Sequence, residues 1–145
     1  MLADQGYEVV NSPRHYQGAG GIEAIDVVES IWGYEAHLPT ALIYILRHRR
    51  KGNPAIDLQK AQWWVRRWLT APVTFQVHVT PGSMSSAAIA KAFGFDEDSH
   101  VSHAIHLLLV ATRAMAEDRR RAAGRECIES LDMELARIGA APCSP

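Results

Sequence analysis

Residues 53–72 read NPAIDLQKAQWWVRRWLTAP, and this stretch predicts a helix with a clear beginning and end. Asn53 is a residue type that caps helices, and Pro54 would occupy the first turn, where its missing N–H costs nothing. An apolar stripe then recurs at helical spacing through Leu58, Ala61, Val65 and Leu69. The Ala-Pro pair that follows ends the pattern, so the stretch indicates a helix with one buried face.

Two further helices are expected before this one. The first begins near Gly21, because Ile25, Val28 and Trp32 recur at three- and four-residue spacing until Gly33. The second runs from about residue 38 to residue 50 and ends in a Lys-Gly pair. Residues 1–19 carry turn and loop chemistry instead of a packed element.

The C-terminal half predicts three more helices and one extended segment. A short helix capped by Ser83 or Ser85 would run to Phe93, with Gly94 ending it. Residues 96–99 signal the start of a longer helix that reaches residue 115. Gly124 then interrupts the pattern, and a last amphipathic helix covers residues 128–138. Residues 73–79 read VTFQVHV, an alternation typical of a half-buried strand.

We therefore expect a single domain over residues 1–145 of mainly α class, with about six helices and one short β-strand or extended arm near 73–79. A lone strand leaves backbone groups unpaired, so it would pair with a symmetry mate or lie as an arm. Three tryptophans of one helix cannot all face one stripe: Trp63, Trp64 and Trp68. We expect a homo-oligomer with segment 73–79 and exposed tryptophans at its interface.

Composition and charge exclude several classes of protein. The 145 residues are 48% apolar and 21% charged, which excludes wholesale disorder and a fibrous repeat. The net charge of −1 gives no global positive field, so we do not expect the chain to coat duplex DNA. The apolar run 107–111 is far shorter than the ~20 residues that span a bilayer. With no signal peptide and no CxxC pair, we expect a reduced, cytoplasmic protein that binds no membrane.

The second predicted helix carries a basic face beside an aromatic ring. Tyr44, Arg47, His48 and Lys51 lie at i, i+3, i+4 and i+7. The ring could stack a base while the guanidinium and the ammonium hold phosphates. The alternative is a solvated basic end, which the dipole at a helix C-terminus favours by itself.

Paired carboxylates stand at the start of the first predicted helix. Glu23 and Asp26 are one turn apart and could hold Mg²⁺ together with substrate phosphates and water. The preceding Gly18-Ala19-Gly20-Gly21 could present backbone N–H groups to an anion, through Gly20 and Gly21. The alternative is that the carboxylates only complement the helix dipole. No G-x-x-x-x-G-K-[ST] motif occurs, so an ordinary P-loop is excluded.

Two other sets of residues have functional and plain interpretations. Asp57, Lys60 and Trp64 share a face of the third predicted helix, where an Asp–Lys pair beside a half-covered ring is the plain interpretation. Three histidines recur at three-residue spacing: His100, His103 and His106. They fan over roughly 120° of the helix surface, so all three can hardly bind one metal ion. A pair such as His100 and His103 could bind one if another element completed the coordination shell.

Four blocks in order resemble the SaV-like family of small phage proteins, long catalogued as a domain of unknown function. They are Asn11-x-Pro13-x-His15-Tyr16, then GIEAIDVVE at 21–29, then Ala41-Leu42-x-Tyr44-Ile45-x-Arg47, then Lys51-Gly52-Asn53-Pro54-x-x-Asp57-Leu58-x-Lys60-Ala61-x-Trp63. The resemblance covers about residues 11–70 and leaves 71–145 as an unassigned helical part.

The family includes a podovirus nucleotide kinase that phosphorylates deoxynucleoside monophosphates without a Walker motif. The resemblance therefore implies a nucleotide site. Its candidate residues are His15, Tyr16, Glu23, Asp26, Tyr44, Arg47, Lys51, Asp57 and Lys60. With Gly20 and Gly21 they would form a site that binds nucleotide and Mg²⁺.

Three functions are consistent with these residues. The first is a phage-encoded, Mg²⁺-dependent nucleoside monophosphate kinase, since phosphoryl transfer needs mainly positioning and charge neutralisation. The second is a counter-defence protein that sequesters a host nucleotide signal in the host cytoplasm without turnover. The third is a protein inhibitor of a host defence enzyme, with the Trp-rich helix as its interface.

Overall fold

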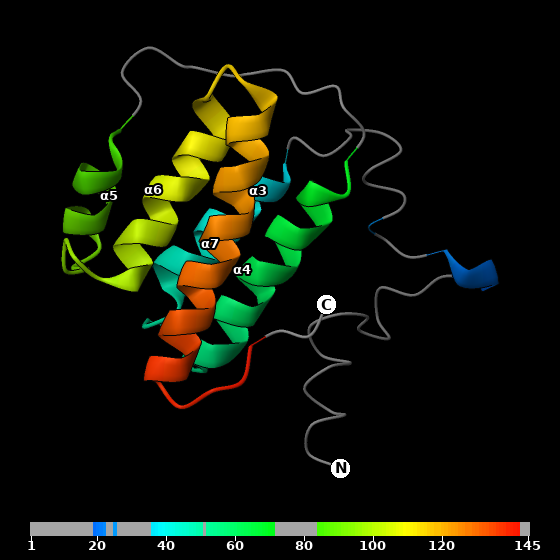
Figure 1. Ribbon diagram of the computed structural model, residues 1–145. Helices are drawn as coiled ribbons and strands as arrows, with labels where there is room; N and C mark the ends of the chain where they lie inside the picture. The colour runs from blue at the N-terminus through cyan, green and yellow to red at the C-terminus, as the bar shows by residue number, and fades with distance from the viewer. Residues whose placement is uncertain (1–18, 23–24, 26–35, 51, 72–83, 143–145) are drawn as a thin grey trace.

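The computed structural model describes residues 19–22, 25, 36–50, 52–71 and 84–142. Within these residues the chain forms one 3-10 turn and five α-helices (Figure 1). They are η2 Ala19–Gly21, α3 His37–Arg47, α4 Pro54–Leu69, α5 Ser86–Ala92, α6 His100–Arg113 and α7 Glu117–Arg137. The mainly α class is confirmed. The predicted strand at 73–79 and nearly all of the predicted first helix lie outside the described residues.

The helices are arranged as two hairpins with a short helix at one side. α3 and α4 form one hairpin, and α6 and α7 form the other. α4 packs against α7, α3 packs against α6, and α5 lies beside α6 (Figure 1). A single core cluster contains side chains from all five helices, so α3 and α4 are held in place by the C-terminal half of the chain.

The core consists of the apolar stripes that the sequence predicts. Leu58 and Val65 of α4, Ile105 of α6 and Leu131 of α7 are all fully buried. Burying a side chain of this kind contributes about 1.5–3 kcal/mol. Ile45 of α3 is equally buried, so α3 is anchored along the side that faces the bundle.

Helix caps stand where the sequence places them. The Asn53 side chain accepts a hydrogen bond from the backbone N–H of Ile56 at 3.3 Å, and Pro54 begins α4. Ser85 caps α5 and Ser99 caps α6 in the same way. Each cap satisfies an N–H that the helix itself leaves without a partner. Gly94, with φ of +75°, follows α5 as expected.

The predicted break at Gly124 is wrong. α7 runs unbroken through this residue, and the chain instead turns at residues 114–116, where Ala114 is extended with ψ of 139°. A Cβ at position 124 would lie 2.9 Å from Cζ3 of Trp68. The glycine therefore allows α7 to approach α4 closely, which a reading of local helix propensity does not reveal.

Two arginines in the first turns of α7 cap the C-terminal ends of other helices. Arg120 Nε donates to the carbonyl oxygen of Ala111 in α6 at 2.8 Å. Arg121 donates to the carbonyl oxygens of Leu69 and Ala71 at the end of α4, both at 2.8 Å. Burial lowers the pKa of Arg120. Carbonyl groups at helix ends need partners, and those at the end of α4 find theirs about 50 residues further along the chain.

In the described part of the chain, none of the helices combines the length and apolar character that crossing a bilayer requires.

Candidate functional site

The α3–α4 hairpin brings four of the sequence-predicted site residues together. Tyr44 and Arg47 lie on α3, and Asp57 and Lys60 lie on α4. We call these four residues the hairpin cluster. The last turn of α3 faces the first turn of α4, as the contact between Arg47 and Asp57 shows. Two faces that the sequence treats separately therefore form one surface.

The cluster is organised by a bidentate ion pair. Arg47 Nε donates to Asp57 Oδ2 and Arg47 Nη2 donates to Asp57 Oδ1, each at 3.0 Å. The Asp57 side chain is 8% exposed, whereas that of Arg47 is 35% exposed. The hydrogen bonds that Arg47 donates to Asp57 raise the pKa of Arg47, so the guanidinium stays charged. Two of its five N–H donors are used in the pair.

Both cations of the cluster contact the ring of Tyr44. Arg47 Cζ lies 4.5 Å from the ring centroid and Lys60 Nζ lies 5.6 Å from it. Cation–π contacts at exposed sites contribute about 0.5–1 kcal/mol each. The ring therefore positions the two positive charges, and a base could stack on it only by competing with them.

His48 does not belong to the surface that its spacing predicts. Its side chain is 1% exposed, its Nδ1 lies 2.5 Å from the carbonyl oxygen of Ile45, and its ring stacks on Phe95 with centroids 5.5 Å apart. Burial lowers the pKa of His48. Consecutive residues of a helix point in directions about 100° apart. Arg47 therefore reaches solvent while His48 points into the bundle.

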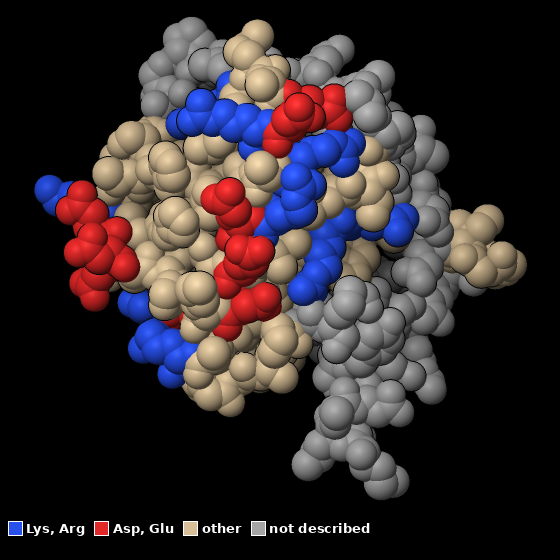
Figure 2. All heavy atoms as spheres, in the orientation of Figure 1, with Lys and Arg blue, Asp and Glu red and all other residues tan. Residues whose placement is uncertain are grey.

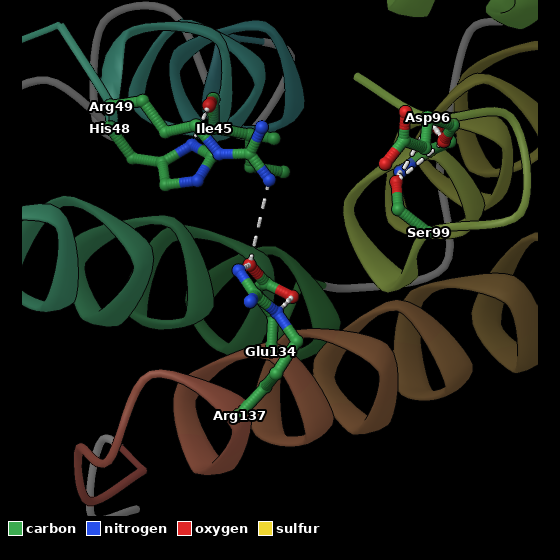
Figure 3. Close-up of polar contacts among 8 residues, drawn as sticks. Ile45, His48, Arg49, Asp96, Ser99, Glu134 and Arg137 are labelled. Atoms are coloured by element: carbon green, nitrogen blue, oxygen red, sulfur yellow. Dashed lines mark hydrogen bonds and ion pairs between the residues drawn. The ribbon is translucent and has the colours of Figure 1, made fainter.

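The C-terminal end of α7 carries a buried carboxylate that the sequence analysis does not identify. Glu134 accepts two hydrogen bonds from Arg137, at 2.9 and 2.6 Å, and Arg49 lies 3.9 Å away (Figure 3). The hydrogen bonds from Arg137 lower the pKa of Glu134. In Figure 3 the ring of His48 lies beside Arg49, above this carboxylate. The buried carboxylate is thus paired with two guanidinium groups at the end of the bundle.

Three arginines near the end of α3 each lie over an aromatic ring. Besides Arg47 over Tyr44, Arg49 Cζ lies 5.1 Å from the Phe95 centroid and Arg50 Cζ lies 4.8 Å from that of Phe93. The latter two join α3 to the turn between α5 and α6. On the face drawn in Figure 2, acidic side chains gather near the centre and basic side chains lie beside them, so neither sign covers the face.

The tryptophans of α4 differ in their surroundings. Trp68 is 2% exposed and belongs to the core, so an interface made of all three tryptophans is wrong. Trp64 packs against the core and meets the His37 ring edge-on at 5.0 Å. Trp63 is half-buried and meets Trp64 edge-on, with centroids 5.1 Å apart. It lies one turn beyond Lys60 on α4.

The glycine-rich turn is separate from the hairpin cluster. Gly20 and Gly21 have φ of 71° and 76°, left-handed values that favour glycine, and both are exposed. Figure 1 shows η2 away from α3 and α4, so this arrangement does not bring it to Arg47. Five predicted site residues lie outside the described residues and stay predictions: His15, Tyr16, Glu23, Asp26 and Lys51.

A groove of about 1060 Å³ lies between α5 and α6. Its lining includes His100, His103 and His106, and the rings of the last two are 6.5 Å apart. Ser86 Oγ lies 3.3 Å from Nδ1 of His106. Nowhere in the described ranges do three or more His, Cys, Asp or Glu side chains converge to hold a metal ion.

Comparison with known proteins gives one family match. Residues 10–66 match the model of a family described as a protein of unknown function, DUF3310. The matched range contains the whole hairpin cluster and stops before α5, α6 and α7. No curated protein matches the chain. No solved structure matches it either.

Proposed function

We propose that this chain binds nucleotides at the hairpin cluster. The observation that carries the proposal is the bidentate Arg47–Asp57 pair, which fixes a charged guanidinium at a half-exposed position beside a second cation, Lys60. A phosphate group needs cationic donors that are already oriented, because ordering flexible side chains costs binding free energy. Tyr44 holds both cations within reach of one ligand.

The first form of the proposal is a nucleoside monophosphate kinase without a P-loop. The γ-phosphoryl group of ATP would pass to a phosphate oxygen of the monophosphate, giving ADP and a nucleoside diphosphate. Arg47, Lys51 and Lys60 would neutralise phosphate charge, and such transfer depends mainly on positioning and electrostatics. The resemblance to the SaV-like family, with its phage nucleotide kinase, supports this form.

Magnesium is part of this form. Glu23 and Asp26 would hold Mg²⁺, a cation that proteins usually bind through one or two carboxylates, and the ion would supply positive charge to offset that of the phosphates. Gly20 and Gly21 lie away from α3 and α4 in Figure 1, so they are given no role at the phosphates held by Arg47 and Lys60. For the carboxylates this assignment rests on their spacing in the sequence, since both lie outside the described residues.

A second form, sequestration of a host nucleotide signal by a phage counter-defence protein, is favoured by one observation. Asp57 is the one carboxylate of the hairpin cluster, and both of its oxygens accept hydrogen bonds from Arg47. The cluster thus offers a ligand charged donors but no free carboxylate, which suits binding without turnover. We also predict that the chain forms a homo-oligomer, and inhibition of a host defence enzyme is a further alternative.

One experiment separates turnover from sequestration. The full chain is incubated with the four deoxynucleoside monophosphates, ATP and MgCl₂, and in a parallel sample with cyclic nucleotides. Chromatography is then applied both to the solution and to the ligand released by denaturing the protein. New diphosphates support the kinase, whereas unchanged nucleotide released from the protein supports sequestration. Neither new product nor retained nucleotide in any sample would reject the proposal.

A further inference from the structure

We infer that Trp63 is the surface on which the nucleotide base stacks, and that the site prefers purine nucleoside monophosphates. This inference rests on the nucleotide binding proposed above. It assigns the base to α4, one turn away from the cations, and it replaces the interpretation in which Tyr44 stacks the base.

The ring of Tyr44 is already occupied by two cations. Arg47 and Lys60 both contact its ring, at 4.5 and 5.6 Å. A base that stacked on this ring would have to displace a cation that is needed for the phosphate. Tyr44 therefore orients the phosphate-binding charges, and the base requires a different aromatic surface.

Trp63 lies one helical turn from the phosphate-binding cation Lys60 on α4. It follows Lys60 by three residues, so the two side chains share one side of the helix with a rise of about 4.5 Å between them. Phosphate and base of one nucleotide are separated by a single sugar. A monophosphate held at Lys60 would thus place its base near Trp63, with no second nucleotide needed to bridge the distance.

Trp63 is held in position without being part of the core. It is half-buried and meets Trp64 at an interplanar angle of 87°, while Trp64 packs on the core and on His37. Among the described residues, no cation lies over the Trp63 ring, in contrast to Tyr44. An indole that is held in place by Trp64 and has no cation over its ring is suited to stacking on a nucleotide base.

The indole ring also favours one class of base. An indole is the largest aromatic side chain, and base–aromatic stacking tolerates any base because each has a π-face. The overlap grows with the area of the base, so a two-ring purine gains more than a one-ring pyrimidine. Charge contacts to the phosphate are the same for both, so the preference would come from Trp63.

The test compares Trp63→Leu with Trp63→Phe in the full chain, with circular dichroism to confirm folding. Titration calorimetry uses dAMP, dGMP, dCMP, dTMP and 2-deoxyribose 5-phosphate, which lacks a base. We expect Trp63→Leu to weaken dAMP and dGMP binding by about fivefold or more, and Trp63→Phe to keep most of the affinity. Binding of 2-deoxyribose 5-phosphate should be unchanged in both variants.

The outcomes separate this inference from the proposed function. If wild-type protein binds dAMP or dGMP and Trp63→Leu binds them equally well, the stacking role is wrong while nucleotide binding stands. If Trp63→Leu weakens 2-deoxyribose 5-phosphate to the same extent, its effect is structural and the inference is overturned. If the wild type binds none of the nucleotides, both fail. A wild type that binds dCMP and dTMP as tightly as dAMP and dGMP rejects the purine preference.

Discussion

Arg47 and Asp57 join the last turn of α3 to the first turn of α4 through two parallel hydrogen bonds of 3.0 Å. The pair closes the hairpin and also fixes the guanidinium that we place at the phosphate. The carboxylate is nearly buried while the guanidinium reaches solvent. In the proposed site Asp57 would position the guanidinium, and Arg47 would contact the ligand.

A double-mutant cycle measures this pair. Arg47→Ala, Asp57→Ala and the double variant are unfolded in urea, and the free energies of unfolding are compared. We expect a coupling of about 1 kcal/mol, because the bidentate geometry is good but the arginine is partly solvated. Arg47→Ala should cost more than Asp57→Ala, since it leaves a nearly buried carboxylate without its partner. Strictly additive changes in the free energy of unfolding would show that Arg47 and Asp57 do not stabilise each other.

His48 should make the stability of the fold depend on pH. Burial lowers its pKa in the folded state, although Glu134 and Asp57 act in the opposite direction and Arg49 acts with the burial. The unfolded chain then binds a proton near the ordinary histidine pKa of about 6.5 while the folded chain does not. Stability contributed by neutral His48 is therefore present above that pKa and is lost as the pH falls below it.

His48→Phe removes the titrating group and keeps a ring against Phe95. Urea unfolding at pH 7.5 and pH 5.5 should show a smaller loss of stability in the variant than in the wild type. His103→Phe is the matched control, because it makes the same substitution at an exposed histidine. An equal loss in wild type and His48→Phe would show that other groups carry the pH dependence.

Gly124→Ala distinguishes a helix break from a close contact. If Gly124 only weakened the helix, alanine would stabilise the protein by about 1 kcal/mol. The structure places the new Cβ 2.9 Å from the buried ring of Trp68, and overpacking of this kind typically costs about 1–3 kcal/mol. We expect a lower midpoint of thermal unfolding in the variant. A higher midpoint would mean that α7 does not approach α4 as described.

The magnesium assignment is tested by Glu23→Gln combined with Asp26→Asn. If the two carboxylates hold Mg²⁺, a magnesium titration in the presence of dAMP and ATP should lose its effect on binding or turnover, while stability barely changes. If they only complement a helix dipole, the change should cost on the order of 1 kcal/mol of stability. Identical magnesium curves for variant and wild type would leave only the dipole explanation.

Local signals in the sequence predict much of the helical framework. Asn53 marks the start of α4 correctly, Ser85 is one of the two caps expected for α5, and Ser99 lies within the start signal expected for α6, because a cap depends on residues within one turn of it. Spacing also predicts which residues of α3 and α4 share a face. Spacing therefore suggests Tyr44 as a site residue, whereas Lys60 is suggested by the resemblance to the SaV-like family.

The remaining features depend on contacts between distant segments. From the sequence alone Gly124 predicts a helix break, because Trp68, whose ring leaves no room for a side chain at position 124, lies on another helix. His48 shares a face with Arg47 by spacing, yet Phe95 buries it. The Arg47–Asp57 pair joins two helices that the sequence analysis considers one at a time. Helical periodicity describes each element and does not specify which elements meet.

The most direct test of nucleotide binding is titration calorimetry on Arg47→Ala combined with Lys60→Ala. The four deoxynucleoside monophosphates and a set of cyclic nucleotides are titrated into wild type, this variant and a control, Lys91→Ala with Arg125→Ala, which removes the same charge elsewhere. We predict that at least one nucleotide binds the wild type and the control alike, and that the hairpin variant loses ~2 kcal/mol or more of binding free energy. Unchanged affinity in a folded hairpin variant, or no binding of any nucleotide to the wild type, would contradict the account.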